Sequence, residues 1–120
     1  MYTAEAVKEV FPFIFTTPTQ AGVSRREPGM PSSAGDPRRA TMMNDAVADV
    51  RWAWRTCEWI SDRQAKAVLL TVLPYRDADL AEILGVSGSN YSHLMNVGFR
   101  ELANWLNATP EQREARYVPA

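Results

Sequence analysis

Residues 77–106 read DADLAEILGVSGSNYSHLMNVGFRELANWL, and the pattern of this stretch indicates the fold. Leu80, Ile83 and Leu84 recur at i, i+3 and i+4, which predicts a short helix with one apolar face. Gly85 can take the left-handed conformation that ends a helix, and Ser87 is a favourable N-cap for a second helix. The stretch therefore predicts a short helix, a three-residue turn and a longer helix, which is the helix-turn-helix layout.

The second of these helices has two chemically different faces. At about 100° per residue, one face is apolar and is expected to lie in the core: Tyr91, Met95, Gly98, Phe99, Leu102 and Leu106. The opposite face carries Ser89, Asn90, His93, Asn96, Val97 and Arg100. Small, hydrogen-bonding or methyl-bearing side chains of this kind read base edges when a helix enters the major groove. The alternative is a solvated outer face on an ordinary small helical bundle.

Two motifs carry a resemblance to a known family. Residues 61–70 (SDRQAKAVLL) and residues 79–87 (DLAEILGVS), followed by a long helix with the tripeptide Arg100, Glu101 and Leu102, resemble region four of bacterial sigma factors and the regulators that share this module. The resemblance covers residues 59–107. It implies a domain that reads double-stranded promoter DNA with its last long helix and also contacts RNA polymerase.

The same resemblance implies further DNA contacts. In the sigma-like module, the loop equivalent to residues 74–77 lies close to the DNA backbone, so Arg76 is expected to contact a phosphate, ahead of Lys66. Ser87, at the start of the long helix, completes the predicted DNA-binding set. Such helices usually carry several Lys or Arg residues, whereas this one has only Arg100.

Charge sets a limit on autonomous DNA binding. The chain has a net charge of −1, and residues 42–107 contain six basic and eight acidic side chains. Affinity for DNA comes largely from phosphate neutralisation, so DNA-binding domains are normally basic. We therefore expect the domain to need a second contact, made by a partner protein, by its own tails or by another copy.

Composition argues against several other classes of protein. Cys57 and His93 are single residues of their types, so no disulfide, metal site or catalytic dyad is expected, and no enzyme, cofactor or small-molecule substrate is predicted. No apolar run reaches the roughly 18 residues of a membrane span, and the N-terminus lacks a secretory signal. The expected compartment is the cytoplasm of a bacterium or phage host.

The first 41 residues are organised differently from the rest. Thr3 can cap a short helix that Pro12 should end, and an apolar cluster follows within residues 1–15. Val10, Phe11, Phe13 and Phe15 in this cluster either dock onto a partner or fold back as additional core. Residues 16–41 are rich in Pro, Gly and Ser and predict a flexible, largely disordered linker. Its pairs Arg25–Arg26 and Arg38–Arg39 could bind phosphates or an acidic surface, or serve only for solubility.

Three more helices are expected around this central pair. One begins at Asn44 or Asp45 and runs to about Trp59, with a broad apolar stripe on which Trp52 is either an exposed anchor for a partner or part of the core. Another, capped by Ser61, runs from Asp62 to Leu73 before Pro74, with its inner face formed by Ala65, Val68, Leu69, Val72 and Leu73. Residues 108–120 form a polar tail whose short helix, started by Thr109 and Pro110, should fray.

These observations predict an all-α protein, a small helical bundle in residues 42–107 with a sigma-region-four-like helix-turn-helix. In size, isolated module and Trp-rich helix, it is similar to phage Q-type antiterminators and to the GafZ-like transcription activators of gene-transfer agents. That likeness implies a regulator that binds near a promoter, loads onto RNA polymerase, with or without a second activator protein, and promotes initiation or read-through. Two alternatives are a dimeric repressor and a protein-only adaptor for RNA polymerase or a sigma factor.

Overall fold

The computed structural model describes residues 1–15 and 37–116, and every element in these two ranges is helical. The short α1 (Ala4–Val10) continues into a 3₁₀ helix, η1 (Phe11–Phe15). The elements of the second range are α3 (Pro37–Thr56), α4 (Asp62–Leu70), α5 (Asp77–Leu84), α6 (Gly88–Asn107) and α7 (Pro110–Arg116). The all-α prediction is confirmed. Most of the predicted linker, including Arg25 and Arg26, lies outside the described residues.

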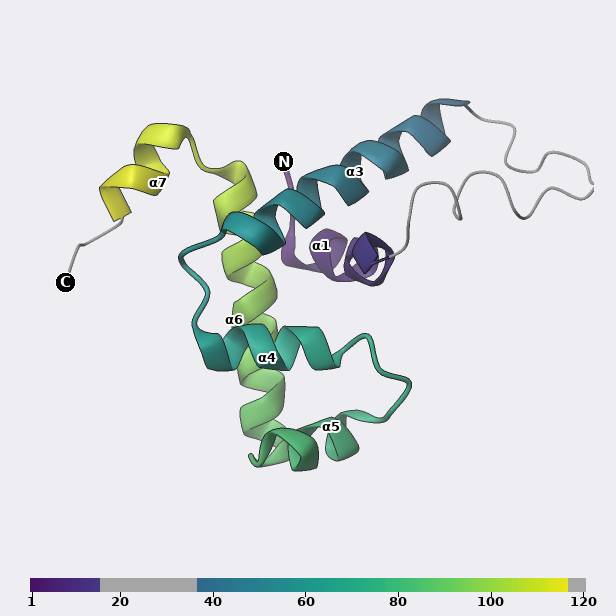
Figure 1. The fold of residues 1–120 in the computed structure, drawn as a ribbon, viewed down its shortest axis with the longest axis vertical. Helices are drawn as coiled ribbons and strands as arrows, with labels where there is room; N and C mark the ends of the chain where they lie inside the picture. Colours follow the sequence, from purple (N-terminus) through teal and green to yellow (C-terminus); the bar gives the residue numbers. More distant parts are fainter. Residues whose placement is uncertain (16–36, 117–120) are drawn as a thin grey trace, which may run out of the picture.

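The long helix α6 is the centre of the fold (Figure 1). Helices α1, α3, α4 and α5 all pack against it, and α7 follows it at one end of the molecule. Its predicted inner face is confirmed, because Tyr91, Met95, Gly98, Phe99 and Leu102 are buried and Leu106 is half-buried. Burial of this face against four other helices is what keeps α6 in place.

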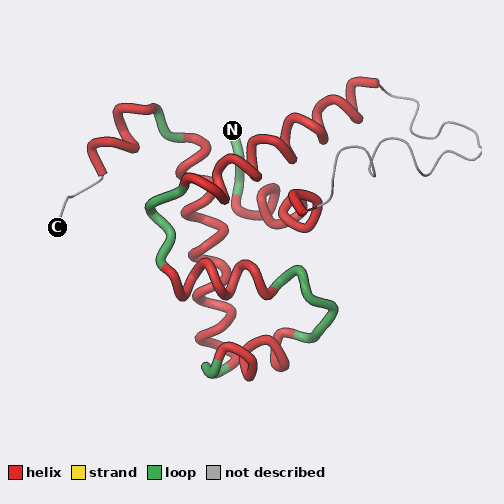
Figure 2. The backbone as a smooth tube through the Cα atoms, viewed as in Figure 1, coloured by secondary structure: helices red, strands yellow, loops and turns green. Residues whose placement is uncertain are grey.

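Local sequence explains where the helices start and stop. The Ser61 hydroxyl accepts from the Gln64 N–H at 3.2 Å while the Gln64 side chain accepts from the Ser61 N–H at 3.0 Å, forming a capping box for α4. Gly85 ends α5 with φ +79°, and the Ser87 hydroxyl accepts from the Asn90 N–H to start α6. Figure 2 shows the resulting short loop between α5 and α6 and the longer loop between α4 and α5.

The N-terminal residues belong to the same core as α6. Val7 and Phe11 are fully buried, and Val10 and Ile14 nearly so. The Phe11 ring meets the rings of Trp54 and Phe99 edge to face, with centroids 5.1 and 5.5 Å apart. The prediction that Val10 and Phe11 bind a partner is therefore wrong, because both side chains fill the core; the alternative, in which the segment folds back, is right for these two.

Three of the predicted helix boundaries need correction. Helix α3 begins at Pro37, so residues 37–41, including the pair Arg38–Arg39, are helical rather than linker, and it ends at Thr56 instead of Trp59. Helix α4 ends at Leu70, three residues before the predicted end. Beyond Leu70 the chain continues in tighter turns as far as Leu73, because the N–H groups of residues 71–73 each donate to the carbonyl three residues before them.

The helix faces of α4 and α5 also differ from the prediction. Ala67 and Val68 are the buried residues of α4, whereas Leu69, Val72 and Leu73, predicted as core, are exposed. In α5, Leu80 and Ala81 are buried and Ile83 is 58% exposed. The rotation of each short helix is set by its contact with α6 rather than by where its largest apolar residues fall.

The polar segment after α6, predicted to fray, forms helix α7. Thr109 and Gln112 cap α7 reciprocally, with bonds of 2.9 and 3.1 Å. The Arg113 guanidinium lies 4.8 Å from the Trp52 ring centroid and 5.2 Å from that of Trp105, and its Nε donates to the Trp105 carbonyl at 2.9 Å. Cation–π stacking therefore replaces the apolar contact that α7 lacks.

Candidate nucleic-acid interface

The outer side of α6 carries the predicted base-reading residues. Five of them are exposed and one, Val97, is half-buried; the exposed ones are Ser89, Asn90, His93, Asn96 and Arg100. They lie on one side of α6 because the helical period places them opposite the buried residues, which begin at Tyr91. The arrangement presents hydrogen-bond donors and acceptors to solvent over residues 89–100 of the 20-residue helix.

The start of α6 is anchored from two directions. Tyr91 is fully buried, and its hydroxyl donates to the Ala67 carbonyl of α4 at 3.0 Å. Burial raises the pKa of the Tyr91 phenol to about 12, with the Asp77 carboxylate adding to the shift, so the hydroxyl keeps its proton. The Ser87 hydroxyl is engaged as the cap and lies 3.4 Å from that of Ser89. Ser87, predicted to contact DNA, therefore has a hydroxyl that already caps α6.

Arg76 lies outside α6, at the N-cap position of α5. Its side chain is 88% exposed, and its Nε lies 3.8 Å from the Asp79 carboxylate. A long, exposed ion pair of this kind contributes little to stability, so the guanidinium can exchange it for another anion. The acidic side chains of Asp77 and Asp79, in the first turn of α5, reduce the attraction of the Arg76 guanidinium for phosphate.

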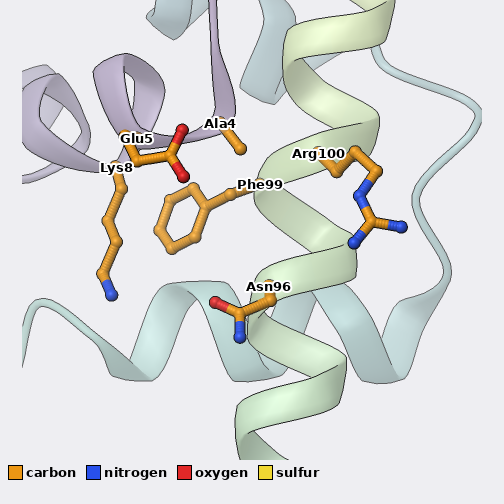
Figure 3. Close-up of a pocket in the computed structure, with 6 residues that line it drawn as sticks. All are labelled: Ala4, Glu5, Lys8, Asn96, Phe99 and Arg100. Atoms are coloured by element: carbon orange, nitrogen blue, oxygen red, sulfur yellow. The ribbon is translucent and has the colours of Figure 1, made fainter.

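A cleft between α1 and α6 adds residues that the sequence pattern did not single out. It has a volume of about 340 Å³ and is lined by Ala4, Glu5, Lys8, Asn96, Phe99 and Arg100 (Figure 3). Asn96 and Arg100 were predicted, whereas Glu5 and Lys8 were not. Nothing in the sequence signals their proximity, since more than 80 residues separate the two sets, roughly the length of a small domain.

Five exposed apolar side chains lie on α4, on α5 and in the loop between these two helices. We call this set the α4–α5 apolar surface; it consists of Leu69, Val72, Leu73, Tyr75 and Ile83. Tyr75 and Ile83, with Asp79 and Glu82, line a hollow of about 500 Å³. Exposed large apolar side chains on neighbouring elements are candidates for an interaction surface. The sequence pattern predicts four of the five as core.

The remaining predicted partner-binding residues have different surroundings. Phe13 and Phe15 are each about half exposed, and the Phe15 ring meets that of Phe11 edge to face with centroids 5.4 Å apart. Their role in binding a partner stays a prediction. Trp52 is 42% exposed, but its ring lies 6.2 Å from that of Trp105 and under the Arg113 guanidinium. Helix α7 thus covers part of the proposed anchor.

Comparison with protein-family models, with curated proteins and with solved structures found no match to this chain. Across residues 1–15 and 37–116, no helix combines the length and the apolar character needed to span a membrane.

Proposed function

We propose that this protein is a DNA-binding transcription regulator that inserts the outer side of α6 into the major groove and acts together with bacterial RNA polymerase. The observation that carries the proposal is the exposed polar side of α6, joined to α5 through a left-handed Gly85. The resemblance of residues 59–107 to region four of sigma factors supports the same reading and adds promoter DNA as the target. By the narrower likeness, the regulated genes are phage-like late genes or gene-transfer-agent genes, through activation or antitermination.

The dimensions of α6 suit this role. A helix with its side chains is about 10–12 Å across, and the major groove is about 12 Å wide, so one helix fills the groove. Helices α4 and α5 pack on the inner face of α6, through contacts such as the Tyr91–Ala67 bond, and leave Ser89, Asn90 and His93 open. Asn96 offers a side-chain amide that can pair with adenine, and Arg100 a guanidinium that can pair with guanine.

The charge balance indicates that DNA binding by this chain alone is weak at physiological salt and stronger at low salt. Residues 1–15 add one lysine and two glutamates to a predicted domain that is already acidic. Few phosphate contacts are available, so counterion release contributes little. A second weak contact raises the overall affinity through effective concentration, without strengthening the DNA interface itself. The α4–α5 apolar surface and the exposed Phe13 and Phe15 are the surfaces on which we expect RNA polymerase or a second activator protein to bind.

The test is a binding measurement on selected DNA. The full-length chain is used to enrich random-sequence duplexes, and the recovered duplex is titrated by fluorescence anisotropy at fixed salt. Asn96→Ala and Arg100→Ala should each weaken binding by about 1–3 kcal/mol if they reach base edges. Asn104→Ala is the matched control, since Asn104 is exposed on α6 but lies outside the predicted set. Wild-type affinity in all three variants would show that this side of α6 does not read DNA.

A protein-only adaptor is a second candidate, favoured by the α4–α5 apolar surface and the acidic charge. In that case α6 never meets DNA, and capture of RNA polymerase or a sigma factor depends on residues such as Ile83 or Phe13. Variants of His93 and Arg100 would then leave the activity unchanged. Enrichment of a defined DNA sequence by the wild-type chain would exclude a function through protein contacts alone.

A further inference from the structure

Helix α1 lies beside the proposed DNA-reading side of α6. Helix α1 is fixed there through Val7 and Phe11, which are fully buried, and through the contact between Phe11 and Phe99. The Asn107 side chain adds two bonds to the backbone of Tyr2, at 2.8 and 2.7 Å. The position of α1 relative to α6 is therefore set by the core and is not that of a loose arm.

The cleft between the two helices brings α1 side chains to the same opening as the α6 residues. Phe99, with only 1% of its surface exposed, closes the bottom of the cleft. Figure 3 shows Lys8 on one side of Asn96 and Arg100 projecting on the other side. Asn96 thus lies between two cationic side chains that come from different helices.

The charges at this opening are available to an outside ligand. Lys8 is exposed, and no ion pair holds its ammonium group among residues 1–15 and 37–116. A lysine ammonium is a compact charge on a flexible stem, so it can reach a phosphate over several ångströms. Glu5 is exposed one turn before Lys8, and Figure 3 shows its side chain directed toward the Phe99 ring.

We propose that α1 forms a side wall of the DNA-binding surface and that Lys8 contacts a backbone phosphate of the strand that borders α6 on the side away from Arg100. This inference rests on the proposed function. A helix that fills the major groove has a phosphate backbone on each side, so an element fixed beside α6 meets one of the two strands. Glu5 repels the same backbone and limits how closely that strand approaches the cleft.

The experiment measures the salt dependence of binding to a mixed-sequence DNA duplex, because a phosphate contact does not depend on base sequence. Lys8→Gln should weaken DNA binding. It should also make the negative slope of log association constant against log salt concentration shallower by about 0.9, the value for one lost phosphate contact. Lys8→Arg should restore the slope. Glu5→Gln should tighten binding, since it removes the repulsion at the same cleft.

Arg55→Gln is the matched control, because Arg55 is an exposed cation on α3 to which no DNA contact is assigned. It changes the net charge by the same amount as Lys8→Gln but leaves α1 unchanged. Equal slopes for Lys8→Gln and Arg55→Gln, or unchanged affinity in Glu5→Gln, would overturn the role of α1 and leave the proposed function standing. Absence of binding by the wild-type chain at low salt would overturn the proposed function itself, and the role of Lys8 with it. Circular dichroism of each variant verifies that the fold is kept.

Discussion

Gly98 of α6 lies so close to Val68 of α4 that a Cβ atom added at Gly98 would be 2.5 Å from Val68 Cγ2. The same atom would be 3.2 Å from the backbone carbonyl of Gln64, which cannot move aside as a flexible side chain could. The close approach of α4 and α6 therefore depends on a glycine at this position, and it brings the Tyr91 hydroxyl within reach of Ala67.

Gly98→Ala should lower the free energy of unfolding by about 1–3 kcal/mol, because the added methyl group overpacks the contact between α4 and α6. Urea denaturation followed by circular dichroism measures the change. Gly88→Ala is the control, since a Cβ at Gly88 meets nothing within 4 Å and alanine favours the helix. A Gly98→Ala variant as stable as wild type would mean that the two helices can separate without cost.

Gly85→Val should lower stability by about 1–2 kcal/mol, because a side chain at φ +79° meets its own backbone. No heavy atom lies within 4 Å of a Cβ at this site, so the effect comes from the backbone conformation alone. Gly85→Asn should be milder, because asparagine tolerates the left-handed region better than other residues. Thermal melting of the two variants separates these effects; equal melting temperatures would contradict a conformational cause.

Arg113→Gln should release α7, because it removes the stacking on Trp52 and Trp105 and the bond to the Trp105 carbonyl. The expected loss is about 0.5–2 kcal/mol, accompanied by a red shift of tryptophan fluorescence as the two rings become more exposed. Glu114→Gln is the control, since Glu114 is the exposed neighbour on the same helix. An unchanged emission spectrum in Arg113→Gln would indicate that α7 is held by other contacts.

Stability should fall as the pH rises from about 10 toward 12. The pKa of Tyr91 is about 12 in the folded chain, raised mainly by burial, whereas an unfolded tyrosine has a pKa of about 10. In this window the unfolded chain binds fewer protons than the folded one, so raising the pH favours unfolding; below about 10 the contribution is retained in full. Burial also raises the pKa of Tyr2 to about 12, with its hydrogen bond to Asp49 adding to the effect, so Tyr91→Phe should reduce the slope without abolishing it. Urea midpoints are measured for wild type and Tyr91→Phe between about pH 10 and 12. The same dependence on pH in both proteins would refute the role of Tyr91.

Leu73→Ser and Ile83→Ser should reduce co-purification of RNA polymerase with the tagged full-length chain. Both side chains are exposed, so their stability effects should stay within about 0.5 kcal/mol. Met43→Ser is the control, because Met43 is a similarly exposed apolar residue on α3. Normal polymerase capture by both variants would remove the α4–α5 apolar surface from the proposed function and leave Phe13 and Phe15 as the remaining candidates.

The sequence predicted α6 well because the helix is long and its two faces differ sharply in polarity. Tyr91, Met95, Phe99 and Leu102 are buried and Asn96 is exposed, as the helical period requires. The caps at Ser61 and Ser87 and the left-handed Gly85 were equally predictable, since each depends on only a few neighbouring residues.

Three of the failures involve packing between helices, which no local pattern reports. Phe11 is buried because Trp54 and Phe99 enclose it, and no local pattern reports such a partner. Ile83 is exposed because the contact with α6 turns Leu80 and Ala81 inward. Lys8 joins the proposed interface for the same reason, through the packing of α1 on α6.

The bonds between Tyr2 and Asn107 join residues that are 105 positions apart, and this separation has a consequence for biosynthesis. The first helix leaves the ribosome long before the helix that buries it, so Phe11 and its apolar neighbours remain uncovered while most of the chain is being made. Contacts between such distant segments form slowly compared with a local helix. Until translation passes the end of α6, the nascent chain exposes part of this apolar segment, and exposed apolar surface of this kind favours aggregation.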